Sequence, residues 1–170
     1  MTRLALRAFV LAASSVVLVE VAAAGLLDSP PPTLPSGGTS RVVYRLGPVN
    51  HSPPDAAGGV ETVVRCTNLS AGTIDIALEI FDQQDVRVGI AIRAGVGAGA
   101  AVEFITAPAA EFPAAQAVPG LPLVAFGKAR VSTTTTQLGC EALHAIRSRN
   151  AGSPIRLSAV ELVKKVAVGN

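Results

Sequence analysis

The sequence predicts an all-β domain, an antiparallel sandwich or barrel of seven or eight short strands. Three observations support this prediction. Apolar and polar residues alternate with a period of two in several segments, prolines and glycines mark frequent turns, and no convincing helical pattern lies between the segments. The chain has 170 residues, of which 49% are hydrophobic and 15% charged, so it can bury a core and does not belong to the disordered class.

Two neighbouring segments have the clearest strand pattern. Residues 73–82 place isoleucines and a leucine on one face and mostly polar residues on the other, which predicts a half-buried strand. Residues 86–93 alternate in the same way, with Arg87 and Arg93 on the outer face. The two segments predict a hairpin with a three-residue loop at 82–84. The resulting cross-strand pairs are Ile80 with Val86, and Glu79 with Arg87.

Shorter alternations predict the other strands, and a Pro-rich loop is expected at residues 107–122. The C-terminal stretch 159–168 leaves two possibilities open. It is predicted to contribute to a strand, but Glu161 and Lys165 stand four residues apart, a spacing that also suits a helix. The further predicted strands are residues 41–46, 60–66, 100–105, 123–134, 138–147 and 155–162.

Residues 1–24 have the three-part layout of a secretory signal peptide. Arg3 and Arg7 precede the apolar run Ala8–Val19, and three alanines before Gly25 provide small residues for a signal peptidase. The apolar run has about a dozen residues, whereas a membrane-spanning helix needs about 20. We therefore expect a secreted, periplasmic or cell-surface protein with no stable membrane span after cleavage. A retained membrane anchor is the alternative.

Residues 25–40 are predicted to be a Pro/Gly-rich linker, and residues 41–170 the β domain. The stretch 28–40 has four prolines, two glycines and a single apolar side chain. Such a composition indicates an extended spacer that cannot pack on the domain. A disordered N-terminus without a task is the simpler alternative.

The two cysteines, Cys66 and Cys140, are predicted to form a disulfide. An exported chain enters an oxidising compartment, where an even number of cysteines is normally paired. Two free, buried thiols are the alternative.

Several short motifs follow one another between residues 60 and 162. Cys66-Thr67-Asn68-Leu69-Ser70 heads a long strand, Gly127-Lys128-Ala129-Arg130-Val131-Ser132-Thr133 lies in a later one, and Cys140-Glu141-Ala142 follows. In this order they resemble a loosely defined set of uncharacterised secreted bacterial proteins, immunoglobulin-like β-sandwiches with a paired-cysteine core. The resemblance implies that fold, but no activity or site. Such hairpins usually have glycine where this chain has Asp85, so a positive φ is expected there.

The sequence contains no recognisable catalytic, cofactor-binding or metal-binding residues. His51 and His144 accompany no nucleophile motif and are expected to be solvated or packed. With both cysteines paired, too few ligands remain for zinc. The 14 basic and 12 acidic residues leave a net charge of +2, far below what binding to nucleic acid needs.

We therefore expect a secreted, non-enzymatic module that binds an unidentified protein or envelope component. A structural subunit of an envelope appendage is one alternative. A hydrolase that uses carboxylates near residues 107–122, such as Glu103 and Glu111, is another. Residues 95–99 are expected to form a turn and not a phosphate-binding loop, and Asn68 and Ser70 to support a turn. The acidic residues expected on solvated outer strand faces are Glu61, Asp75, Glu79 and Glu103.

Overall fold

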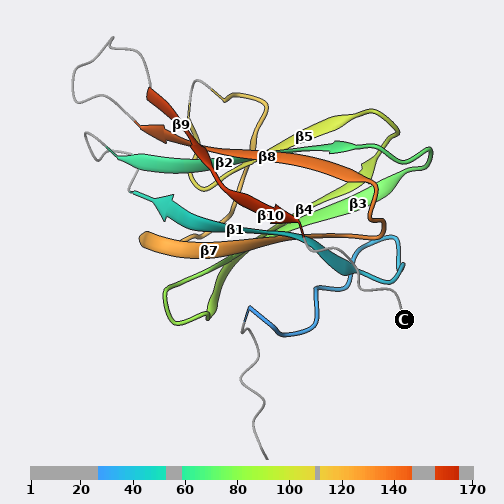
Figure 1. The fold of residues 1–170 in the computed structure, drawn as a ribbon, viewed down its shortest axis with the longest axis horizontal. Helices are drawn as coiled ribbons and strands as arrows, with labels where there is room; N and C mark the ends of the chain where they lie inside the picture. Colours follow the sequence, from blue (N-terminus) through green and yellow to red (C-terminus); the bar gives the residue numbers. More distant parts are fainter. Residues whose placement is uncertain (1–26, 53–58, 110–111, 147–155, 165–170) are drawn as a thin grey trace, which may run out of the picture.

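A computed structural model describes residues 27–52, 59–109, 112–146 and 156–164 (Figure 1). These ranges contain ten strands and no helix, which confirms the all-β prediction. The predicted signal peptide and the end of the 159–168 stretch lie outside them. Within the described part of the chain, no helix has the length and hydrophobicity to cross a membrane. The strands are β1 (Arg41–His51), β2 (Val60–Asn68), β3 (Ile74–Phe81), β4 (Arg87–Val96), β5 (Ala101–Ile105), β6 (Gln116–Ala117), β7 (Val124–Thr133), β8 (Leu138–Ile146), β9 (Arg156–Val160) and β10 (Leu162–Lys164).

The strands form one hydrogen-bonded, barrel-like sheet, and the two separate sheets of a sandwich are not confirmed (Figure 1). One half has the order β4, β3, β7, β1, β10, and the other the order β6, β5, β2, β8, β9. The halves meet where His51 of β1 pairs with Glu61 of β2, and where the chain passes from β9 to β10 at Glu161. On the opposite side β4 and β5 do not pair, so the sheet stays open there. Every strand pair is antiparallel except β5 with β6.

The main hydrophobic core draws its side chains from both halves of the sheet. The predicted core face of β3 is correct, since Ile76, Leu78 and Ile80 are fully buried in this core. A second cluster lies around Val63 of β2, where Phe112 of the loop between β5 and β6 packs against it. The Pro-rich loop therefore covers part of the outer surface of the second half.

The hairpin of β3 and β4 differs from the predicted register. Ile80 pairs with Gly89 and not with Val86. A register shift at the next residue leaves residues 82–86 as the connection, five residues in place of the predicted three. Asp85 has the expected positive φ, at 62°.

As a consequence, β4 presents its other face to the core. Arg93 pairs with Ile76, so its side chain leaves the strand on the core-facing side, whereas it was expected outside. Glu79 pairs with Ile90, although its side chain still reaches Arg87 at 3.0 Å. The predicted strand face of Arg93 and the predicted pairing of Glu79 with Arg87 are therefore both wrong, although Arg93 is exposed at the open side of the sheet.

The packing around Gly89 explains the reversed face. A Cβ atom at this position would lie 2.6 Å from Leu121 Cδ1 and 2.8 Å from Val118 Cγ1. Both side chains come from the segment between β6 and β7, and they occupy the space beside β4 that its own isoleucines were expected to fill. A chain segment distant in sequence therefore selects the face of this strand.

Residues 27–40, which we call the strap, pack on the sheet. Leu34 is only 2% exposed, and backbone carbonyls of Leu27, Ser29 and Pro30 accept hydrogen bonds from Arg130 of β7. The strap is the blue segment below the sheet in Figure 1. The prediction of a spacer that cannot pack is wrong for this range, because buried polar groups of the sheet hold its backbone.

Cys66 and Cys140 form the predicted disulfide. They lie directly opposite each other on neighbouring strands β2 and β8, with a Cα–Cα distance of 4.2 Å. In immunoglobulin domains the disulfide connects two facing sheets, whereas this disulfide joins two hydrogen-bonded strands within one half of the sheet. The pairing is confirmed, and the immunoglobulin-like arrangement is not supported by it.

Candidate functional site

Polar side chains gather at three places that could carry a function. The first is a buried network around Asn50, where β1 meets β2. The second is a group of buried charges under the strap. The third is an open pocket between β4 and β5, which we call the seam pocket.

The Asn50 network provides hydrogen-bond partners for the backbone at the corner of the sheet. The carbonyl of Asn50 accepts hydrogen bonds from the hydroxyls of Thr62 (3.1 Å) and Thr106 (2.9 Å). Thr106 Oγ1 also lies 3.1 Å from Glu61 Oε2, and His51 Nδ1 lies 3.4 Å from the same carboxylate oxygen. Glu61 is fully buried, so its predicted place on a solvated outer face is wrong. The network closes the corner where His51 pairs with Glu61.

A histidine beside a carboxylate is also how enzymes orient a general base, but a nucleophile must lie next to it. Within the described ranges, His51 makes no hydrogen bond to a serine, threonine or cysteine side chain. His144 Nε2 lies 2.9 Å from the carbonyl of Pro48 and 3.3 Å from Asn50 Nδ2. The contacts of both histidines are therefore structural.

The charges under the strap form a row across three strands, in which Glu79 and Arg130 are buried and Arg87 is partly exposed. Glu79 of β3 is fully buried; its Oε2 accepts a 2.6 Å hydrogen bond from Arg130 Nε of β7, and its Oε1 lies 3.0 Å from Arg87 Nη1 of β4. Arg130 also lies over the ring of Phe81, 5.2 Å from its centroid. The predicted solvated position of Glu79 is wrong, because the strap covers this face of β3.

Asp75 is held in the same way at the other end of β3. It is 3% exposed, and it accepts hydrogen bonds from the backbone N–H groups of Ser36 (2.6 Å) and Gly95 (2.9 Å). Burial alone raises the pKa of Asp75, but these hydrogen bonds to the ionised form outweigh it and leave the pKa below its ordinary value. Asp75 therefore fixes the strap to the sheet as a carboxylate, and its predicted solvated position is also wrong.

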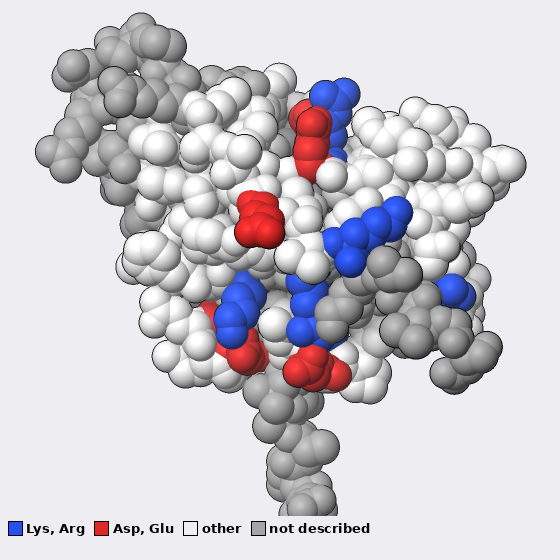
Figure 2. All heavy atoms as spheres, in the orientation of Figure 1, with Lys and Arg blue, Asp and Glu red and all other residues white. Residues whose placement is uncertain are grey.

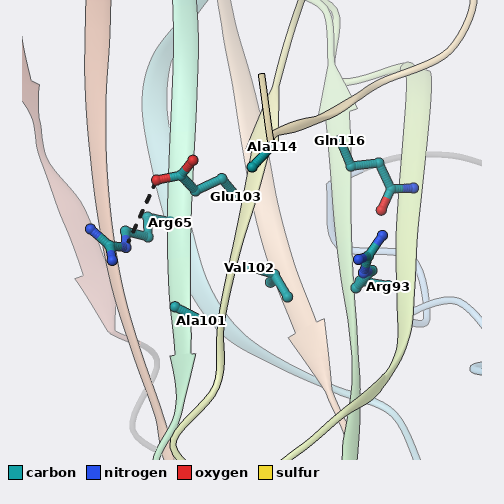
Figure 3. A pocket seen from close by; sticks show the side chains of 7 residues that line it. All are labelled: Arg65, Arg93, Ala101, Val102, Glu103, Ala114 and Gln116. Carbon is teal, nitrogen blue, oxygen red and sulfur yellow. Dashed lines mark ion pairs between the residues drawn. The ribbon is translucent and has the colours of Figure 1, made fainter. Parts of the chain in front are cut away.

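The seam pocket has a volume of about 340 Å³ and lies at the open side of the sheet (Figure 3). Arg65 of β2, Arg93 of β4, Glu103 of β5 and Gln116 of β6 supply its polar groups, and Val102 and two alanines its apolar surface. In Figure 3, Glu103 points toward Arg65, while Arg93 and Gln116 lie on the other side and point toward each other.

The two arginines of the pocket differ in their partners. Arg65 lies between two carboxylates, with its Nε 3.9 Å from Glu103 Oε1 and its Nη1 3.9 Å from Glu141 Oε1. Arg93, in contrast, has no ion pair or side-chain hydrogen bond to any described residue. Gln116 Nε2 donates to the carbonyl of Ile92 at 3.2 Å, whereas its buried Oε1 has no hydrogen-bond partner in the described part of the chain.

Sequence reasoning identified only part of this pocket. Glu103 was a candidate carboxylate and does line it, but Glu111, its proposed companion, lies outside the described residues. Arg93 was assigned to the outer face of its strand, and nothing in the local sequence distinguishes Gln116. The signal that could have found Arg93 is Gly89, whose missing side chain leaves room for Val118 and Leu121 on the core side of β4.

Other surfaces offer less chemistry. On the face in Figure 2, basic and acidic side chains are interspersed and do not gather by sign. A larger pocket of about 540 Å³ beside β8 and β9 is mainly apolar, with Glu141 as its charged residue. The described residues contain no group of three histidine, cysteine or acidic side chains that could hold a metal ion. The turn expected at residues 95–99 lies at residues 97–100, because β4 continues to Val96. The expected turn at Asn68 is present, and its Oδ1 accepts hydrogen bonds from the N–H and the hydroxyl of Ser70.

Comparison of the chain with protein-family models, with curated proteins and with solved structures finds no match. The resemblance to secreted bacterial immunoglobulin-like proteins therefore stays a prediction.

Proposed function

We propose that this chain is an exported, non-enzymatic domain that acts by binding a protein or another component of the cell envelope or surface. The observation that carries the proposal is the Cys66–Cys140 disulfide, which is compatible with an oxidising compartment. The N-terminal sequence pattern supports export independently.

The use of the polar side chains supports a binding role over catalysis. The contacts of Glu61, Asp75, Glu79 and both histidines hold strands, corners or the strap together. Among the polar groups that line the seam pocket, Arg93 and Gln116 Oε1 have no partner in the described residues; they are a cation and an acceptor. This combination suits recognition of a ligand better than a proton transfer.

The proposal is tested with the full chain in its oxidised form. Fractionation of cells that produce it, with thiol alkylation before and after reduction, is expected to place it outside the cytoplasm without a free thiol. Envelope proteins cross-linked to it are then identified, purified and bound again to the oxidised chain. Cytoplasmic chain with titratable thiols contradicts export, and no partner that binds again contradicts the binding role.

The hydrolase alternative is tested in parallel. A panel of ester, peptide and glycoside substrates is offered to the full chain and to Glu103→Gln. We expect no turnover by either protein. Turnover that is lost in Glu103→Gln contradicts the non-enzymatic proposal.

A further inference from the structure

We infer that the seam pocket binds an extended peptide segment that carries a carboxylate, with the carboxylate on Arg93 and the peptide backbone along the open strand edges. This inference rests on the proposed binding role and names its site and ligand class.

The first step is the open edge of the sheet. The chain passes from β4 to β5 through only residues 97–100, where Ala100 N–H donates to the Gly97 carbonyl at 3.1 Å. Antiparallel strands joined so closely commonly pair as a hairpin, but here β4 pairs only with β3, and residues 101–103 of β5 pair only with β2. Alternate backbone groups on both strands therefore point into the seam, as on any edge strand, and can pair with an added strand.

The second step is the charge of the pocket. Its three charged side chains are Arg65, Arg93 and Glu103, and a fourth, Glu141, reaches Arg65 from β8. The two carboxylates both lie beside Arg65, which leaves Arg93 as the cation without a counter-ion in the described residues. A guanidinium binds a carboxylate through two parallel hydrogen bonds, so an acidic side chain or a C-terminal carboxylate complements this group.

The third step is the amide of Gln116. Its Nε2 already occupies the carbonyl of Ile92 on the edge of β4, much as the N–H of a neighbouring strand does. Its Oε1 is buried, has no donor in the described part of the chain, and points toward Arg93 in Figure 3. Buried acceptors are almost always hydrogen-bonded, and a peptide N–H in the seam supplies the missing donor.

These three features together select the occupant. A free anion satisfies Arg93 but leaves the strand edges and Gln116 unpaired, and an uncharged strand leaves Arg93 unpaired. An extended segment with one acidic group next to a backbone N–H satisfies all three. The apolar wall at Val102 then faces a neighbouring side chain of the segment, because side chains alternate along a strand.

The test is a selection of random octapeptides on phage against the oxidised full chain, followed by binding measurements on one selected peptide by fluorescence anisotropy. We expect an acidic residue to be enriched at one position. Arg93→Gln is expected to weaken binding of the synthetic peptide about tenfold or more, the range of a lost charge-assisted hydrogen bond. Arg41→Gln, which removes an exposed arginine at the start of β1, is the matched control and is expected to bind as the natural chain does.

Two further peptides separate the contributions. Replacing the acidic residue with its amide is expected to weaken binding to the natural chain and to leave binding to Arg93→Gln unchanged. Methylation of alternate backbone nitrogens is expected to abolish binding, and hydrogen exchange is expected to slow at residues 90–96 and 101–103 when the unmethylated peptide binds.

The inference is overturned if no peptide is selected, if the selected peptides lack an acidic residue, or if Arg93→Gln and Arg41→Gln bind alike. It is also overturned if acetate alone competes fully with the peptide, or if the chain forms dimers in which Arg93→Gln dissociates the copies. These outcomes are separate from a failure of the proposed function. If an envelope component binds Arg93→Gln as well as it binds the natural chain, the binding role is supported and only the seam pocket is excluded as its site.

Discussion

Each half of the sheet carries a row of three charged side chains, with the central charge between two of opposite sign. The two rows differ in burial and in the lengths of their contacts. On one half, Glu79 lies between Arg87 and Arg130; on the other, Arg65 lies between Glu103 and Glu141. In the Glu79 row, Glu79 and Arg130 are buried under the strap and Arg87 is 43% exposed, and the contacts are 2.6 and 3.0 Å. In the Arg65 row, both contacts are 3.9 Å and the central Arg65 is 54% exposed.

The difference shows that burial by a distant segment decides what a charge on a strand does. The strap excludes water from Glu79 and Arg130 and supplies carbonyls for the remaining donors of Arg130. The Arg65 row stays in water, where such pairs contribute little to stability. The half with the exposed row carries the disulfide, and the half with the buried row carries the strap, so each half has a different means of stabilisation.

The largest effect is expected from removing the disulfide. The bond closes a loop across 74 positions, for which the chain-entropy model gives about 4.5 kcal/mol as an upper value. The double variant Cys66→Ala/Cys140→Ala is therefore expected to lose up to about 4.5 kcal/mol in free energy of unfolding by urea titration. The natural chain under reducing conditions is the control and should lose a similar amount. A loss below about 1 kcal/mol in both would contradict the importance of the bond for the exposed half.

The next effect compares the two rows directly. Glu79→Gln removes the charge of a buried pair and leaves Arg130 uncompensated, so we expect a loss of about 3 to 4 kcal/mol in free energy of unfolding. Glu103→Gln is the matched variant in the Arg65 row, and a loss below about 0.5 kcal/mol is expected because that pair is solvated. Urea titration at neutral pH measures both. Equal losses would show that the strap does not distinguish the two rows.

A smaller effect tests the strap itself. Leu34 is 2% exposed, and Leu34→Ala is expected to lower the free energy of unfolding by about 2 to 3 kcal/mol through lost burial and the cavity left behind. Leu69→Ala, which shortens a leucine that is 63% exposed, should change it by less than about 0.5 kcal/mol. An unchanged stability of Leu34→Ala would mean that residues 27–40 act as the spacer that their composition predicts.

The smallest effect is a pH dependence from Asp75. Because the folded state lowers its pKa, Asp75 stabilises the fold at pH above the ordinary aspartate value of about 4, and this contribution is lost as the pH falls through the folded pKa. Asp75→Asn is therefore expected to be less stable than the natural chain at pH 7, with a smaller difference at pH 3. Urea midpoints at the two pH values measure this. A difference that does not change with pH would show that the charge of Asp75 is unimportant.

The fold was predictable where local alternation and cysteine count determine it. The period of two in residues 74–80 identifies β3 and its core face, and an even cysteine count in an exported chain identifies the disulfide partners. Neither signal predicts the register of β4 against β3. That register depends on a shift after Ile80 and on side chains from the segment between β6 and β7. The predicted face of Arg93 failed for this reason.

The candidate site depends on the same long-range information. Glu103 could be named from its place near a long loop, but the site also needs an unpaired edge, an exposed Arg93 beside that edge and the amide of Gln116. None of these has a local sequence pattern, because each arises from how strands far apart in the chain are ordered. The predictions that β3 is half-buried and that the linker cannot pack failed for one reason. The segment that was expected not to pack is the strap, and it buries Glu79 and Asp75 on the second face of β3.

The packed strap also shortens the reach of the domain. With a freely extended segment over residues 20–40, a retained anchor that ends at Val19 could hold the domain up to about 70 Å from its point of attachment. Because the carbonyl of Leu27 is already bound to Arg130, only residues 20–26 can span the distance from such an anchor to the strap, and their greatest length is about 25 Å. A chain anchored at its N-terminus would therefore stay within about 25 Å of its membrane, and cleavage would be the step that lets it diffuse away.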